Sequence, residues 1–190
     1  MPNPNSPFGF RPVTRMGGSP LSIREYGKAA ADTNPIFAFD LVGHITGGTP
    51  PPIPEAPNAW TLSRIQDGTQ LTPGTSLWLG ASLSSGIASK ATVHPVTDEI
   101  DVVYIAQVSG ATAITNAAHA NLNANVLNTA GAPPKLTSNM QVNATGIAVT
   151  AGLDLRILRV AMITGNSEGP NAVVECVIGK HAFAQGSAGS

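Results

Sequence analysis

The strongest strand signal in the sequence is IDVVYIAQV, residues 100–108. β-Branched and aromatic residues dominate this segment, Asp101 stands at its start and Gly110 follows its end. Such a composition fits the pleated surface of a β-sheet better than a helix. The segment therefore predicts a strand. The segments on either side of it indicate which further strands and helices the fold contains.

Further strand signals lie on both sides of this segment. β-Branched, aromatic or alternating apolar residues bounded by Gly and Pro mark them, at residues 36–48, 60–66, 76–83, 153–163 and 172–178. The runs at 60–66 and 76–83 are joined through Asp-Gly and Pro-Gly pairs, which favour turns between antiparallel strands. One short helix is expected across residues 114–121, in a passage rich in Ala and Asn.

These segments predict a mainly β protein, with a single antiparallel β-barrel or sandwich domain. Short strands punctuated by Gly and Pro, with hardly any helix, are typical of both architectures. We expect an extended N-terminal arm at residues 1–20, the β domain at residues 21–183 and a flexible tail of small residues at 184–190.

Charge is sparse in this chain. Only 11% of its 190 residues are charged and the net charge is −1, whereas about a quarter of the residues are charged in an average soluble domain. The lysines and arginines are scattered, so we expect no nucleic-acid partner. A neutral surface instead suits contact with other protein subunits. No secretory signal and no membrane-length apolar run is visible, so we expect no membrane partner and synthesis in a cytoplasm.

The residues that could carry chemistry are far apart in the sequence. The single cysteine, Cys176, lies in the apolar run VVECVIGKH and is expected to be a buried hydrophobe rather than a reactive thiol. Ser82 lies in GASLS, which lacks the second glycine of a nucleophile elbow. No histidine has another His or a Cys at the spacing of a local metal site; they are His44, His94, His119 and His181. We therefore predict no enzymatic activity, no metal and no organic cofactor.

The N-terminal arm contains SPFGFRPV, residues 6–13, with two phenylalanines one glycine apart. The flanking prolines remove backbone donors and favour extended geometry, and the arm has too few apolar neighbours to build a core of its own. We therefore expect four residues to bind a partner while the body folds without them: Phe8, Phe10, Arg11 and Pro12. The alternative is that both phenylalanines pack into the protein's own barrel.

Four segments carry a resemblance to a known family: SPFGFRPV, YIAQV at residues 104–108, LDLRILRV at 153–160 and GNSEGPNAVVECVIGKHAF at 165–183. They resemble virion structural proteins of tailed bacteriophages, of the kind that decorates or cements the head. The resemblance implies a protein without an active site that binds the major capsid protein on the outer surface of the virion. It also implies a homotrimer that bridges capsid subunits with three arms and gains avidity from them.

Two other classes of protein remain open. A head-fibre or tail base subunit would share the β architecture, although such proteins more often carry a long repetitive shaft, which this chain lacks. A carbohydrate-binding or hydrolytic β-barrel would need an aromatic platform or a pair of carboxylates. Aromatic residues make up only 5% of the chain, and no carboxylate pair is visible in the sequence.

Overall fold

The segment IDVVYIAQV forms the second strand of a five-stranded antiparallel sheet. Its strand β7 (Val102–Gln107) lies between β1 (Arg11–Arg15) and β12 (Val173–Ile178). β12 pairs with β11 (Leu155–Val160), and β11 pairs with the short β8 (Asn123–Ala124). We call this sheet, with the order β1-β7-β12-β11-β8, sheet A. The strands expected at residues 100–108, 153–163 and 172–178 are confirmed.

The computed structural model describes residues 3–28, 35–44, 62–64, 77–86, 92–129, 131 and 134–184, and for residues 44 and 62–64 it describes the backbone alone. The expected Asp-Gly and Pro-Gly turns lie outside these residues. The expected tail also lies outside them, apart from Ala184.

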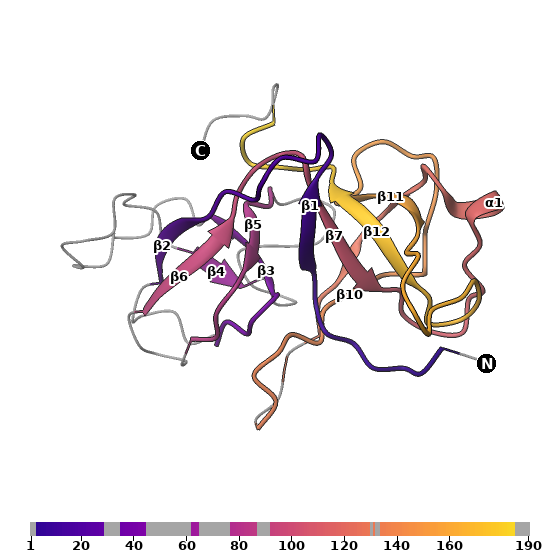
Figure 1. Ribbon diagram of the computed structural model, residues 1–190, viewed down its shortest axis with the longest axis horizontal. Helices are drawn as coiled ribbons and strands as arrows, with labels where there is room; N and C mark the ends of the chain where they lie inside the picture. The colour runs from indigo at the N-terminus through magenta and orange to yellow at the C-terminus, as the bar shows by residue number, and fades with distance from the viewer. Residues whose placement is uncertain are drawn as a thin grey trace.

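A second five-stranded antiparallel sheet, sheet B, lies beside sheet A (Figure 1). Its strands, in spatial order, are β2 (Arg24–Lys28), β6 (Thr92–Thr97), β5 (Gly80–Ser82), β3 (Leu41–His44) and β4 (Leu62–Arg64). β4 and β5 arise from the two alternating runs joined by turn residues, yet β3 lies between them in space. The end strands β2 and β4 also approach each other, so sheet B is curled.

The remaining elements are small. β9 (Val126–Leu127) and β10 (Gln141–Val142) form a two-stranded ribbon, and α1 (Asn116–His119) is a single helical turn within the expected range. The Asn116 side chain accepts a hydrogen bond from the Val160 backbone N–H at 2.7 Å. α1 therefore covers part of the edge of β11 that β8 is too short to pair.

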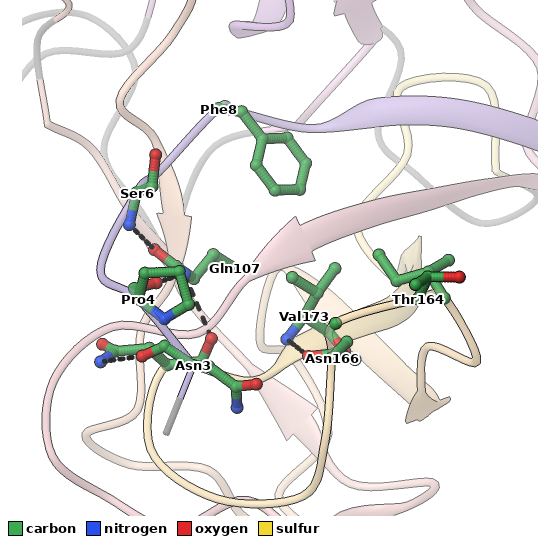
Figure 2. Close-up of a pocket in the computed structure, with 11 residues that line it drawn as sticks. Asn3, Pro4, Ser6, Phe8, Gln107, Thr164, Asn166 and Val173 are labelled. Carbon is green, nitrogen blue, oxygen red and sulfur yellow. Dashed lines mark hydrogen bonds between the residues drawn. The ribbon is translucent and has the colours of Figure 1, made fainter. Parts of the chain in front are cut away.

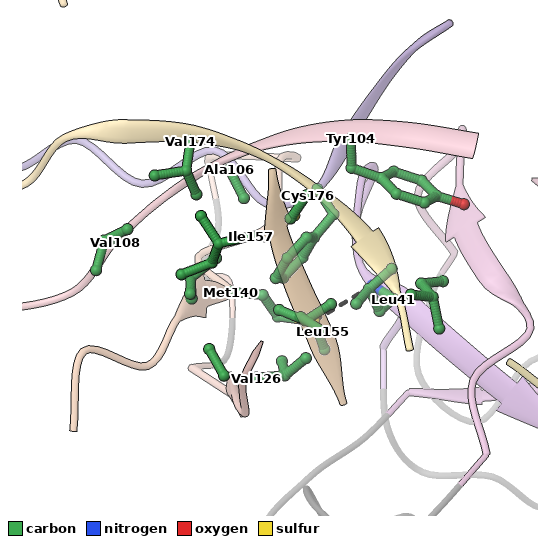
Figure 3. Close-up of a cluster of buried hydrophobic side chains, with 14 of the residues drawn as sticks. Leu41, Tyr104, Ala106, Val108, Val126, Met140, Leu155, Ile157, Val174 and Cys176 are labelled. Carbon is green, nitrogen blue, oxygen red and sulfur yellow. Dashed lines mark hydrogen bonds between the residues drawn. The ribbon is translucent and has the colours of Figure 1, made fainter. Parts of the chain in front are cut away.

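The main hydrophobic core joins the two sheets. Tyr104 on β7 lies opposite Cys176 on β12, and both side chains are fully buried. Figure 3 shows them with Leu155 of β11 and with Leu41, which comes from β3 of sheet B. Trp78 is also fully buried in this cluster. Sheet B also has a smaller core of its own on its other face, formed by Tyr26, Ile36, Val42, Leu79 and Val96.

The protein is thus mainly β, with antiparallel sheets in a sandwich-like arrangement, as predicted from the sequence. Within the described segments no ladder closes either sheet into a barrel. No helix in this part of the chain has the length and apolar character needed to cross a membrane.

Candidate partner-binding site

The expected N-terminal arm lies on the surface of its own domain rather than free of it. The Asn3 side chain donates to the carbonyl oxygens of Ser167 at 2.8 Å and Pro170 at 3.0 Å. It also accepts a hydrogen bond from the Ser167 backbone N–H at 3.1 Å. Asn3 is therefore buried, although it stands near the start of the chain.

Gln107, the last residue of β7, holds the next part of the arm. Its amide nitrogen donates to the carbonyl oxygens of Pro4 at 2.8 Å and Asn171 at 3.1 Å. Its amide oxygen accepts from the Ser6 backbone N–H at 3.0 Å. Gln107 occupies the outward-pointing series of its strand, so the chain from Asn3 to Ser6 crosses the end of sheet A and covers it.

A pocket of about 180 Å³ opens between this part of the arm and the loop before β12 (Figure 2). Side-chain amides dominate its polar lining, but internal hydrogen bonds already occupy them. Asn166, for example, donates to the carbonyl oxygens of Ala161 and Val173 and accepts from the Val173 N–H. The polar residues that line the pocket therefore hold the arm against the domain, rather than offering free polar groups to a ligand.

Phe10 corrects the expectation for the arm. Its side chain is 0% exposed and belongs to the main core, and its backbone N–H donates to the Phe39 carbonyl at 2.8 Å. The prediction that the body folds without this residue's side chain is therefore wrong, because Phe10 fills part of that body. Phe8, two residues earlier, remains half-buried at the surface.

Pro12 and its neighbours form a strand rather than a free extended segment. Pro12 lies opposite Tyr104 in the β1–β7 ladder, and the register shifts between Pro12 and Thr14. β1 is an edge strand of sheet A. A proline and a bulge are devices that discourage a further strand from pairing at an edge. Pro12 therefore shapes the edge of the sheet, and its expected contact with a partner stays a prediction.

Arg11 is the expected site residue that the structure leaves most open. It is exposed, and its guanidinium carbon lies 5.4 Å from the centre of the Phe8 ring and 5.2 Å from the centre of the Phe39 ring. Both distances fall within the range of cation–π contacts. Sequence reasoning missed Phe39, because a phenylalanine in an apolar segment gives no sign that it will meet a residue 28 positions away.

The loop containing Lys135 and Leu136 borders these three residues. The Lys135 ammonium donates to the Pro7 carbonyl oxygen, and the Leu136 carbonyl accepts from the Ala38 backbone N–H at 3.1 Å. The Leu136 side chain is 62% exposed. We name the resulting area the Arg11 surface; it consists of Phe8, Arg11, Phe39, Lys135 and Leu136.

Sheet B brings together a serine and a histidine that are separate in the sequence. Ser82 Oγ on β5 and Ser84 Oγ each lie 3.2 Å from His94 Nδ1 on β6, and Thr92 Oγ1 lies 2.8 Å from His94 Nε2. Burial lowers the pKa of His94, and the nearby charge of Lys28 adds to that effect. Ser82 and His94 are both 0% exposed, so no substrate can reach the pair in this conformation. It links β5 to β6 within the sheet.

The other candidates for chemistry are also isolated. Cys176 is buried as expected, and burial raises the pKa of its thiol to about 12. His119 lies in α1 and His181 is buried near the end of the described chain. Across the described ranges, no three His, Cys, Asp or Glu side chains are grouped so that they could hold a metal ion.

Protein-family models, curated protein sequences and solved structures gave no match to this chain. Any function therefore has to be argued from the residues themselves.

Proposed function

We propose that this protein decorates the head of a tailed bacteriophage, where it binds the major capsid protein on the outer surface of the virion. It bridges neighbouring capsid subunits as a homotrimer and stabilises the head without catalysis and without a cofactor. The proposal follows the resemblance described for four of its segments, and the nature of its surface supports it.

The observation that carries the proposal is a group of large apolar side chains exposed where the charged side chains are already paired. Met16, Ile23 and Ile100 are each more than half exposed, and we name them the apolar corner. Hydrogen bonds bring their segments together at the turn between β6 and β7, from the Met16 N–H to the Asp101 carbonyl and from the Ser22 N–H to Glu99.

The charges around the apolar corner are satisfied internally. Arg15 pairs with Glu99 at 3.0 Å and with Asp101 at 2.9 Å, while Arg24 pairs with Asp98 at 3.2 Å. A surface of exposed apolar groups with self-paired charges loses little solvation when another protein covers it. Contact between copies of this chain in the proposed homotrimer is the use that best fits such a surface.

The sealed Ser82–His94 pair supports a non-catalytic role. Acyl transfer needs a serine that substrate can approach, a histidine oriented by a third group and donors for the oxyanion. Ser82 is fully buried, and hydroxyl groups rather than a carboxylate contact His94 in the described part of sheet B.

The proposal is tested with phage heads assembled without this chain. Purified protein is added, and the temperature at which DNA becomes accessible to a dye is compared with and without it, alongside co-sedimentation. We expect the protein to sediment with the heads and to raise the temperature of DNA release. Failure to sediment with heads would overturn the proposal, and sedimentation with isolated tails instead would favour the tail base subunit.

A further inference from the structure

Arg11 differs from the other arginines whose side chains the structure describes. Arg15, Arg24 and Arg159 each pair with a carboxylate, and Arg156 donates a hydrogen bond to Asn121. Arg11 has neither an ion pair nor a side-chain hydrogen bond within the described part of the chain. Arg11 is exposed, and a guanidinium carries five N–H donors.

The protein nevertheless fixes the place of this guanidinium. Arg11 is the first residue of β1 and lies opposite Ile105 in the ladder to β7. The residue before it, Phe10, is buried in the main core and holds the chain in place. The Phe8 and Phe39 rings contact the guanidinium itself. A cation held in one place loses less conformational freedom on binding, which favours affinity for an anionic partner group.

Phe39 is held in an unusual backbone conformation at this surface. Its φ angle is 71°, in the left-handed region that bulky side chains rarely adopt. Two backbone hydrogen bonds keep it there: its N–H donates to the Ser82 carbonyl at 2.7 Å, and its carbonyl accepts from the Phe10 N–H at 2.8 Å. Strained residues cluster at binding sites, where the rest of the fold maintains them.

The Arg11 surface is positively charged and partly apolar. Neither Arg11 nor Lys135 pairs with a carboxylate among the described residues. Phe8, Phe39 and the exposed Leu136 provide apolar area around the two cations. Arginine and aromatic residues together are characteristic of the residues that contribute most to protein–protein affinity.

We propose that the Arg11 surface binds a carboxylate side chain in an exposed segment of the major capsid protein, a partner that rests on the function proposed above. The Arg11 guanidinium takes the carboxylate through two parallel hydrogen bonds, for which its planar fork is suited. Lys135 adds positive charge, and apolar neighbours of the carboxylate rest on Phe8, Phe39 and Leu136. Charge complementarity selects this occupant over an apolar segment, which would leave the guanidinium buried without a partner.

The test measures binding to phage heads assembled without this chain, using the full-length protein and the variants Arg11→Glu and Arg11→Gln. Arg156→Glu is the matched control, because Arg156 is also an exposed arginine without a carboxylate partner, but lies on β11. We expect Arg11→Glu to weaken binding by roughly tenfold to a hundredfold, since hydrogen bonds to charged groups are lost. Arg11→Gln should weaken it less, and Arg156→Glu should stay within about twofold of the unaltered protein.

The outcomes separate this inference from the proposed function. If the unaltered protein does not bind heads, the proposed function fails and this inference fails with it. If the unaltered protein binds and Arg11→Glu binds equally well while its urea midpoint shows that it is folded, only this inference is overturned. The inference is also overturned if Arg156→Glu loses as much affinity, because that result would indicate general attraction to a polyanion such as DNA. It is overturned as well if Arg11→Glu changes only self-association, because the occupant would then be a second copy of the chain.

Discussion

Gly9 decides which of the two N-terminal phenylalanines enters the core. Its φ angle is 81°, and a Cβ at this position would overlap the Phe39 carbonyl oxygen and the Ser138 side chain. The chain therefore turns closely against its neighbours here, so that Phe10 is buried while Phe8 stays at the surface. The sequence predicts both phenylalanines in an extended segment but treats them alike. Their difference arises from contacts with residues 39 and 138, which are remote in the sequence.

Replacing each phenylalanine by alanine should therefore have unequal effects on stability. We expect Phe10→Ala to lower the free energy of unfolding by about 3–5 kcal/mol, because it leaves a cavity in the main core. Phe8→Ala should lower it by about 1 kcal/mol or less, since water already reaches that ring. Urea denaturation followed by tryptophan fluorescence measures both values. Equal losses would contradict the placement of Phe10 in the core and of Phe8 at the surface.

The positions of several strands could be predicted from the sequence, but their partners could not. β7, β11 and β12 lie within runs of apolar residues, and local composition is enough to find such runs. The pairing of β1 with β7 joins residues about ninety positions apart, and no turn or period in the sequence encodes it. For the same reason the arm is predicted to bind a partner, although Gln107 of sheet A and the loop before β12 take up several of its hydrogen-bonding groups. The approach of His94 to Ser82 across β6 and β5 was equally hidden.

The burial of His94 and His181 predicts how the stability of the protein depends on pH. Burial lowers the pKa of His94 and of His181 in the folded protein, so the unfolded chain binds protons that the folded chain does not. Stability is therefore fully present above the ordinary histidine pKa of about 6.5 and falls as the pH is lowered, by up to about 1.4 kcal/mol per pH unit for each histidine.

Urea midpoints at a series of pH values from about 7.5 to about 5 test this expectation. His94→Gln should reduce the dependence on pH, whatever its effect on stability at neutral pH. A pH dependence of the unaltered protein that His94→Gln and a matching His181→Gln both leave intact would contradict the assignment.

At the scale of the whole molecule, the main core joins the two sheets, and the chain has few charges to place on its surface. The Arg11 surface adjoins the outer edge of β1, and the apolar corner lies where β1 ends and β6 turns into β7. Neither surface could be predicted from the sequence, because each is assembled from segments far apart in the chain. The low charge content is visible in the sequence, and it favours contact with other subunits.

A homotrimer is the assembly we expect for the isolated protein. Covering the apolar corner in a subunit interface would remove Met16, Ile23 and Ile100 from water, which is favourable in proportion to the apolar area buried. Size-exclusion chromatography with light scattering should give three times the 19.3 kDa mass of one chain. Ile100→Glu should shift that mass towards one chain, whereas Val149→Glu, at a residue that is even more exposed but lies elsewhere, should not. A monomer at micromolar concentration would contradict the trimer.

The most direct test of the central claim is cryo-electron microscopy of heads assembled without this chain and then incubated with it. Decoration of the capsid predicts additional density on the outer surface of the head, repeated at equivalent positions such as the local threefold axes. The two-sheet domain should fit that density with the Arg11 surface turned towards the major capsid protein. Heads without added density, or density confined to the portal, a fibre or the tail, would contradict the claim that this protein is a capsid decoration protein.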